Sequence, residues 1–434
     1  MAAEVFVAGV GMLKFGRYPD KDVPELGGEA ALLALDDAGL TIRDVQMMAA
    51  GCLFQANAMV GQRIMQEIGQ TGIPVVNVAN ACATGSTAFR TAWQAVASGE
   101  CDVALAVGVE QMGKMGLLGG GGGSGIRTEG VVGSGLMPAV FGQAGMEHMR
   151  KYGTTQAQFA KIAVKNHKHS TRNPLSQYQV ETPLEQVLGA RVVAYPNTLY
   201  MCCPTGDGAA AAVLVSAAKA RQLGAKVKVL ASVLTSDPWT ERDLTFPDVS
   251  TLTRNAAKVA YEKAGVGPDD LDLVELHDCF ATAELLHYEN LGLCADGEAG
   301  RLIDEGEVAW GGRVPVNVSG GLLSKGHPLG ATGVANIFEV TQHLRGNAGA
   351  RQVEGAKVGL AHVIGLGSAC TINVLGARTS SASSPAPAFT LESAEREQIL
   401  RALEAACGRR TAAARLLGLS RRTLYRKLDR HGIA

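Results

Sequence analysis

Cys82 is the strongest candidate nucleophile in the chain, because it follows an apolar strand pattern at 75–78 and opens a helical one. A thiol at a helix N-terminus lies at the positive end of the helix dipole, beside unpaired N–H groups, which lower its pKa and supply thiolate near neutral pH. The segment NACATGS at 80–86 therefore predicts a reactive cysteine. The alternative is a small buried hydrophobe in a tight strand-to-helix turn, since free cysteine is often buried.

Three other segments supply partners for this thiol. The segment ELHDCF at 275–280 ends an expected strand, which places His277 and Cys279 at the carboxyl edge of a sheet, where α/β proteins build their sites. His327 lies between glycine-permitted turns, and the GLG segment at 365–367 closes the last long strand. Two thiols and two imidazoles at strand ends fit covalent acyl transfer.

Alternating β-rich and helical runs must position these residues. We expect strands at 5–10, 75–78, 103–109, 209–215, 227–234, 271–276 and 357–363, and helices at 25–38, 86–97, 251–264 and 334–344. The alternation predicts α/β units with buried parallel strands. Small-residue turns at two helix starts, CATG at 82–85 and ATG at 331–333, indicate a duplicated core.

The chain divides into regions of different composition. We expect an N-terminal half at 1–232 containing a loop subdomain at about 111–200 with a glycine run at 119–123, a C-terminal half at 233–377, a Ser/Pro/Ala linker at 378–388 and a helical tail at 389–434.

These segments resemble the thiolases, in particular the sterol carrier protein X type. The resemblance covers residues 3–377 and rests on the strings HDCF at 277–280 and SKGHPLGATG at 324–333, with support from 147–153, 160–170 and 317–321. It implies a duplicated five-layer αβαβα fold and a homodimer or tetramer. It also implies reversible acyl transfer between coenzyme A and the α-carbon of another acyl-CoA.

The resemblance assigns a role to each candidate. It makes Cys82 the acylated nucleophile and His327 the group that activates that thiol, and it places His277 where ordinary thiolases have an asparagine. Cys279 takes over the proton transfer that ordinary thiolases give to a cysteine near the chain's end. Claisen chemistry needs an acid/base and fixed donors for its oxyanions. We therefore expect Cys279 as the base, His327 and His277 as the first donors, and the amides of Cys82 and Gly367 as a second oxyanion hole, with Cys370 a weaker candidate for the base.

The tail predicts a second function. A short helix at 411–417, a turn at 418–420 and a basic helix at 421–428 have the helix-turn-helix layout, and 390–434 resembles the Fis-type DNA-binding domain. The tail holds ten basic and five acidic residues, in a chain whose net charge is −1. The alternative is a basic hairpin used for dimerisation or solubility. The candidate DNA contacts are Ser420, Arg421, Arg422, Thr423, Tyr425, Arg426 and Lys427.

Composition excludes several classes of protein. The 434 residues are 47% hydrophobic without an apolar run of about 18 residues, which excludes a membrane-spanning or disordered chain. Nine cysteines without CxxC or finger spacing predict free thiols, a reducing cytoplasmic location and no metal site. We expect no permanently bound cofactor, with acyl-CoA and CoA as substrates. The alternative to an enzyme is a transcription regulator whose thiolase part senses acyl-CoA without turnover.

Overall fold

The chain forms two compact units, Met1–Arg378 and Thr379–Ala434. The computed structural model describes residues 3–113, 137–238, 249–377, 398–400, 402–403, 406 and 410–431. The expected glycine run at 119–123 and the expected linker at 378–388 lie outside these residues. No helix within the described ranges is long and apolar enough to cross a bilayer.

The first half of the larger unit is built on five strands in the order β3-β2-β4-β7-β1. Its elements are β1 (Val5–Met12), α1 (Val23–Asp37), β2 (Met47–Gly51), α2 (Val60–Ile68), β3 (Val75–Val78), α3 (Thr84–Ser98), β4 (Val103–Gln111), β7 (Asp207–Ser216) and α7 (Ala217–Leu223). The start of α1 is fixed locally, because Asp22 and Glu25 form a reciprocal capping box and Pro24 occupies the first turn.

The second half repeats this order in β8-β11-β10-β9. Its elements are β8 (Val227–Thr235), α8 (Thr251–Ala264), β9 (Leu273–Glu275), α9 (Ala281–Asn290), α10 (Ala299–Asp304), α11 (Gly321–Ser324), α12 (Leu329–Arg345), β10 (Val358–Gly365) and β11 (Ala369–Ala377). Strands β8, β11, β10 and β9 correspond to β1, β7, β4 and β2, which confirms the duplicated core. The halves join through a short pairing of β1 with β8.

The strands are not all parallel, and this part of the expectation is wrong. Strand β2 is parallel to β3 and β4, and β9 is parallel to β10. Strands β7 and β11, however, run antiparallel to both of their neighbours. The turn between β10 and β11 spans only residues 366–368, too short for the crossover that a parallel pair requires.

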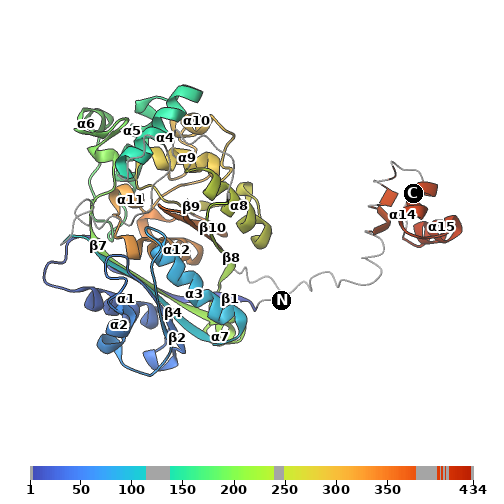
Figure 1. Cartoon of the computed structure of the whole chain (residues 1–434), viewed down its shortest axis with the longest axis horizontal. Helices are drawn as coiled ribbons and strands as arrows, with labels where there is room; N and C mark the ends of the chain where they lie inside the picture. Colours follow the sequence, from blue (N-terminus) through green and yellow to red (C-terminus); the bar gives the residue numbers. More distant parts are fainter. Residues whose placement is uncertain are drawn as a thin grey trace. The chain divides into compact units, whose positions relative to one another are not determined.

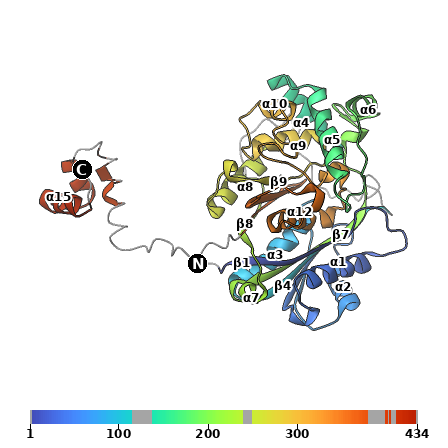
Figure 2. The same cartoon turned by 180° about the vertical axis from the view of Figure 1, so that it is seen from behind.

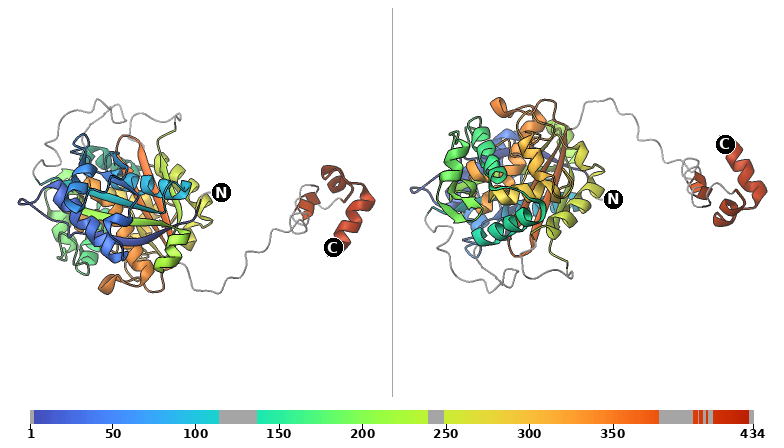
Figure 3. Two further views of the ribbon diagram at one scale, coloured as in Figure 1. Left: turned by 90° about the horizontal axis from the view of Figure 1, so that it is seen from below. Right: turned by 90° about the horizontal axis from the view of Figure 1, so that it is seen from above.

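Five layers result from this duplication. Helices α3 and α12 lie between the strands of the two halves, as Figures 1 and 2 show. Helices α1 and α2 cover the opposite face of the strands of the first half. Helices α8 and α9 cover the opposite face of the strands of the second half. Figure 3 shows these outer layers from below and from above. The fold is therefore the duplicated αβαβα arrangement.

Glycines let α3 and α12 approach backbone to backbone. A Cβ on Gly85 would lie 2.5 Å from the Gly330 carbonyl oxygen, and a Cβ on Gly333 would lie 2.3 Å from the Ser86 amide nitrogen. The helix starts are matched as well, because Cys82 lies two residues before Thr84, where α3 begins, and His327 lies two residues before Leu329, where α12 begins. This contact brings the two residues into one place.

An excursion between β4 and β7 packs on the second half. Its described elements are α4 (Met137–Tyr152), α5 (Gln156–Ser170), α6 (Leu184–Gly189), β5 (Val192–Ala194) and β6 (Asn197–Thr198). Helices α4 and α5 contact α9, and the rings of Phe141 and Phe280 stack with centroids 5.2 Å apart. The excursion therefore lies against the HDCF segment.

The smaller unit contains a helical pair, α14 (Arg410–Leu416) and α15 (Arg421–Arg430). Gly418 in the turn has a φ of +65°, and the Ser420 hydroxyl accepts the Thr423 N–H at 3.1 Å, which caps α15. Leu424 and Leu428 are buried in a small core together with Ile399, Ala402, Ala406, Ala413 and Ala414. Helix α14 corresponds to the short helix expected at 411–417.

Candidate active site

Cys82 is held in a strained turn before α3. Ala81 has a φ of +48°, which is rare for a residue with a side chain. The Thr84 hydroxyl stabilises the turn, since it donates to the Ala81 carbonyl at 2.6 Å and accepts the Asn80 N–H at 2.8 Å. The thiol is 2% exposed and packs in a cluster with Met112, Leu329 and Val363. The turn thus presents one side chain to a buried space.

The expected lowering of the Cys82 pKa is wrong. Burial raises the pKa of Cys82 to about 12, and the backbone N–H groups of Cys82 and Leu366 that bond to the thiol offset only part of this effect. A helix dipole contributes about 0.3–1 kcal/mol near a surface, less than about one pKa unit, whereas full burial shifts a pKa by up to about 3–5 units. The unliganded site therefore holds a neutral thiol.

His327 is oriented as a proton acceptor. The Thr332 hydroxyl donates its only proton to the Pro328 carbonyl at 3.0 Å, so it must accept at its 2.7 Å contact with His327 Nδ1. Nδ1 therefore carries the hydrogen and Nε2 carries a lone pair. Burial, followed by the nearby Lys325 charge, lowers the pKa of His327 to about 3. The imidazole is neutral and can act as a base.

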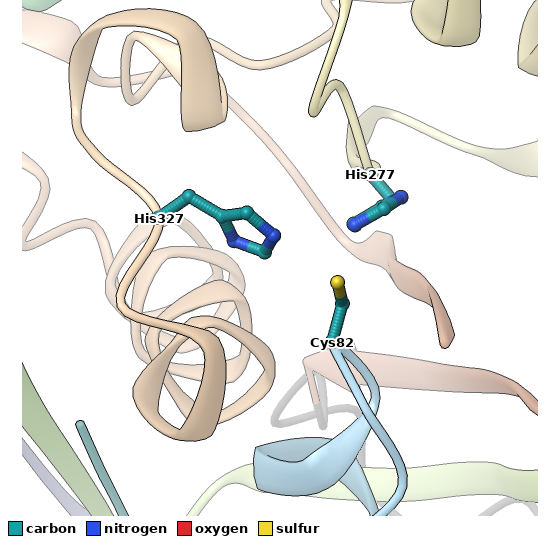
Figure 4. A group of neighbouring side chains, drawn as sticks. All are labelled: Cys82, His277 and His327. Carbon is teal, nitrogen blue, oxygen red and sulfur yellow. The ribbon is translucent and has the colours of Figure 1, made fainter. Parts of the chain in front are cut away.

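Cys82, His277 and His327 converge on one point. The Cys82 sulfur and one nitrogen from each imidazole all lie within 4.8 Å of one another, and the side chains point toward each other in Figure 4. The two rings stand edge to face, with centroids 5.2 Å apart. Burial lowers the pKa of His277 well below its ordinary value. The structure thus brings together three of the four expected catalytic side chains.

Cys279 lies beside this group without belonging to it. It is 3% exposed at the start of α9, and its pKa is well above the ordinary value, first through burial and then through the neighbouring Cys203 and Cys82. The Cys279 carbonyl accepts the Cys203 N–H at 3.0 Å. Cys370, on β11, is fully buried in the core of the second half.

The backbone donors at the thiol include one that the sequence did not indicate. The N–H groups that bond to Cys82 are its own and that of Leu366. Gly367, whose amide is expected in the oxyanion hole, follows Leu366 in the β10–β11 turn and has a φ of +102°. The amide of this turn that bonds to the thiol is that of Leu366, one residue before Gly367.

A buried carboxyl group, that of Asp278, holds the segment before His327 in place. Asp278 accepts the N–H groups of Leu322 at 2.7 Å and Leu323 at 3.2 Å, and a Cβ on Gly321 would lie 2.1 Å from its carboxylate. Burial, then the nearby Glu284, raises the pKa of Asp278 to about 8. The Asp of HDCF therefore fixes α11, which leads into the His327 segment. Sequence reasoning missed this role, although the adjacent glycines 320 and 321 were a signal for it.

A cavity of about 440 Å³ opens beside the site. Cys203 lines this cavity. Because the Cys203 N–H donates to the Cys279 carbonyl, the wall of the cavity lies next to Cys279, the expected acid/base. His167, Tyr178, Tyr200 and Leu323 are among the other residues that line it.

The candidate DNA contacts lie on α15 and its cap. Arg426 is exposed, Thr423, Tyr425 and Lys427 are partly exposed, and the Arg410 guanidinium lies 5.3 Å from the centre of the Tyr425 ring. Ser420 caps the helix. The side chains of Arg421 and Arg422 lie outside the described atoms, so their expected role stays a prediction.

The comparisons with known proteins agree with this geometry. The family model "Thiolase, N-terminal domain" matches residues 5–190, and "Thiolase C-terminal domain-like" matches 237–377. The chain is 43% identical to human "Sterol carrier protein 2" over 85% of its own length and 71% of that protein. It is 39% identical to "Acetyl-CoA acetyltransferase" of Methanothermobacter thermautotrophicus, over 83% of this chain and 96% of the other.

A solved structure has the same fold. The "Ltp2-ChsH2(DUF35) aldolase" superimposes with a TM-score of 0.74 at 25% identity, over 87% of this chain and 98% of the other. The chain belongs to the thiolase family. Its relatives include proteins of the sterol carrier protein 2 type, and its C-terminal residues 390–431 match the model "Bacterial regulatory protein, Fis family".

Proposed function

We propose that the chain is a thiolase-type acyltransferase, which catalyses reversible Claisen condensation or thiolysis of 3-oxoacyl-CoA through an acylated Cys82. The observation that carries this proposal is the convergence of a buried thiol with a neutral imidazole whose Nε2 lone pair has no partner among the described residues. Acyl-CoA and CoA are the substrates, and no permanently bound cofactor takes part.

In thiolysis, Cys82 attacks the 3-oxo carbonyl while His327 Nε2 takes the thiol proton. The protonated Nε2 then donates to a substrate oxygen, because Nδ1 is already bonded to Thr332. The amides of Cys82 and Gly367 hold the tetrahedral oxyanion. When the carbon–carbon bond breaks, Cys279 gives its proton to the enolate carbon. The Cys279 thiolate then deprotonates the incoming CoA thiol, and the CoA thiolate attacks the acyl-Cys82 thioester. Cys82 leaves as a thiolate and takes its proton back from the protonated His327 Nε2, which restores both groups.

The cavity beside the site supports binding of the thioester substrate. The cavity beside Cys203 admits part of the thioester substrate, and the exposed Tyr178 and the partly exposed Tyr200 offer it apolar surface. The chain acts as a homodimer or a tetramer in the cytoplasm, and its tail binds DNA. An acyl-CoA-responsive regulator without turnover is a second candidate, favoured by the helix-turn-helix tail.

Intact-protein mass spectrometry after incubation with a panel of acyl-CoAs tests the proposal. We expect an acyl adduct on the wild-type chain, its loss in Cys82→Ala and its persistence in Cys294→Ala, a partly exposed thiol outside the site. Thiolysis of 3-oxoacyl-CoA is lost with the adduct. Undiminished thiolysis by Cys82→Ala removes Cys82 from the mechanism, and acyl-CoA binding without any adduct favours the regulator.

A further inference from the structure

We propose that Cys82, His277 and His327 form a binding site for a thiophilic divalent cation of the zinc type, and that the bound ion blocks the active site reversibly. The proposal concerns an inhibitory ligand and rests on the side-chain geometry rather than on the proposed reaction. It differs from the sequence expectation, which considered only the spacing of cysteines along the chain.

The donor set has the chemistry that zinc prefers. A cysteine sulfur and imidazole nitrogens bind Zn²⁺ at about 2.0–2.3 Å, which places neighbouring donors of a tetrahedral site about 3.5 Å apart. The three donor atoms already lie within 4.8 Å of one another. A side-chain rotation that moves each donor by less than about 1 Å therefore closes the group around an ion.

Three of the four imidazole nitrogens of the group are without a hydrogen-bond partner among the described residues. Neither nitrogen of His277 has a hydrogen-bond partner, and neither has His327 Nε2, although the two side chains are only 1% and 2% exposed. Buried polar atoms without a partner are uncommon in native proteins, and each calls for an explanation. A metal ion would satisfy one nitrogen of each ring in a single step.

An outer partner prepares one ligand for this role. The hydrogen bond from His327 Nδ1 to Thr332 fixes the ring orientation and leaves Nε2 as the coordinating atom. Ligating histidines almost always donate their other ring hydrogen in this way. Figure 4 shows the His327 ring, the His277 ring and the Cys82 sulfur directed at a common space.

The binding step is balanced without another reactant. The Cys82 S–H bond breaks, a Zn–S bond forms, and the proton leaves to solvent. His277 and His327 each donate a lone pair, and water fills the fourth position of the tetrahedron. The bound ion occupies both the sulfur that attacks the substrate and the nitrogen that takes its proton. Inhibition is therefore expected to be complete and to be reversed by a chelator.

His277 distinguishes this site from a two-ligand contact. Cys82 and His327 alone would supply one thiolate and one imidazole, whereas His277 adds a third protein ligand, the number found in sites that keep one position open. Soft donors of this kind favour Zn²⁺ over Mg²⁺, which prefers oxygen ligands. Mg²⁺ therefore serves as the control ion.

Direct metal binding tests the proposal independently of catalysis. Equilibrium dialysis of the full chain should give one tightly held Zn²⁺ per chain in a Mg²⁺ background. The Co²⁺ form should show a thiolate-to-cobalt charge-transfer band with the intense visible bands of a tetrahedral ion. We expect Cys82→Ser to abolish the charge-transfer band and Cys294→Ser to retain it. His277→Asn should weaken binding at least about tenfold, since even outer-shell partners are worth about 10–100-fold in affinity.

The outcomes separate this proposal from the proposed function. If the chain binds Co²⁺ through Cys82 but forms no acyl adduct, the metal site is supported and the proposed acyltransferase activity is contradicted. Unchanged Zn²⁺ affinity and an unchanged Co²⁺ spectrum in both Cys82→Ser and His277→Asn place the ion elsewhere and overturn the proposal. Circular dichroism checks that the variants fold, and the two variants remove chemically different ligands, so misfolding of one leaves the other decisive.

Discussion

Two opposing effects set the protonation state of Cys82. The start of α3 and the amides of Cys82 and Leu366 favour thiolate, whereas removal of the sulfur from water favours the thiol, and the second effect is larger. The adjacent His327 is likewise neutral. The pair therefore differs from a preformed thiolate–imidazolium pair, and the proton moves only as the nucleophile attacks.

The pH dependence of Cys82 alkylation reports this state. Because the pKa of Cys82 is raised to about 12, the thiolate fraction rises about tenfold per pH unit throughout the neutral and mildly alkaline range. We expect the rate of alkylation by the neutral reagent iodoacetamide, followed by peptide mass spectrometry, to rise without a plateau up to about pH 10. A plateau near neutral pH would show a lowered pKa.

Cys279 is expected to act in a different step from Cys82. Replacement by alanine leaves Cys82 and His327 in place, so acylation of Cys82 by a simple acyl-CoA should persist. Formation and cleavage of the carbon–carbon bond should fall at least about a hundredfold, the usual scale for a positioned acid/base. Cys370→Ala, which removes a buried thiol from the core of the second half, is the matched control. If acylation and cleavage fall together, Cys279 is not the acid/base.

At the scale of elements, the contact between α3 and α12 determines whether nucleophile and base meet. In Gly333→Ala the added Cβ would lie 2.0 Å from the Ser86 hydroxyl and 2.3 Å from the Ser86 amide nitrogen. Helix propensity alone favours alanine by about 1 kcal/mol, whereas overpacking costs about 1–3 kcal/mol. Because the clash includes backbone, we expect a lower thermal unfolding midpoint and reduced acylation of Cys82.

Gly189→Ala provides the control for this prediction. Gly189 ends α6 and is exposed, and in the part of the chain that the structure describes no atom lies within 4 Å of an added Cβ. Its replacement should change stability by no more than about 0.5 kcal/mol. An unchanged midpoint in Gly333→Ala would mean that the helices separate easily and that the contact does not hold the site together.

The sequence predicted the elements that carry long periodic patterns and missed those that depend on context. The strands expected at 5–10 and 103–109 are present in β1 and β4, whereas β2, an MMAAG segment, has residues that suit helix equally well. A strand after the GLG turn is present as β11, and it carries Cys370.

The candidate site, too, could be predicted from the sequence only in part. The meeting of Cys82, His277 and His327 followed from family strings, since residues about 195 and 245 positions apart cannot be brought together by periodicity. The raised pKa of Cys82 could not be predicted from the sequence, because burial of the thiol depends on every layer of the fold. The bond from the Leu366 amide could not be predicted either, because it depends on the conformation of one turn.

At the scale of the whole molecule, the tail should bind DNA in the intact protein. A single helix-turn-helix reads one half-site, so useful affinity requires two copies, which a homodimer supplies. We expect mobility-shift titrations of the full chain to show binding that weakens steeply with salt. Replacement of both Arg421 and Arg422 by alanine should weaken it and reduce the salt slope by about two, one per lost phosphate contact. An isolated 389–434 fragment should bind much more weakly.

A matched loss of charge separates a specific effect from a general one. Arg43 and Lys226 are exposed on the larger unit, and their joint replacement by alanine removes the same net charge. This variant should bind DNA like the wild type. If the Arg421/Arg422 variant also binds like the wild type, or if the intact protein binds no genomic fragment at low salt, the tail is a structural hairpin.

The matched positions of Cys82 and His327, each two residues before an equivalent helix, have a consequence for the ancestry of the site. A chain with a single such half could bring two helix starts together only by pairing with an identical chain, and the symmetric pair would then present the same side chain twice. Two thiols or two imidazoles facing each other cannot divide the roles of nucleophile and base. In one polypeptide the two equivalent positions can carry different residues, so the covalent joining of the halves is what permits an asymmetric site.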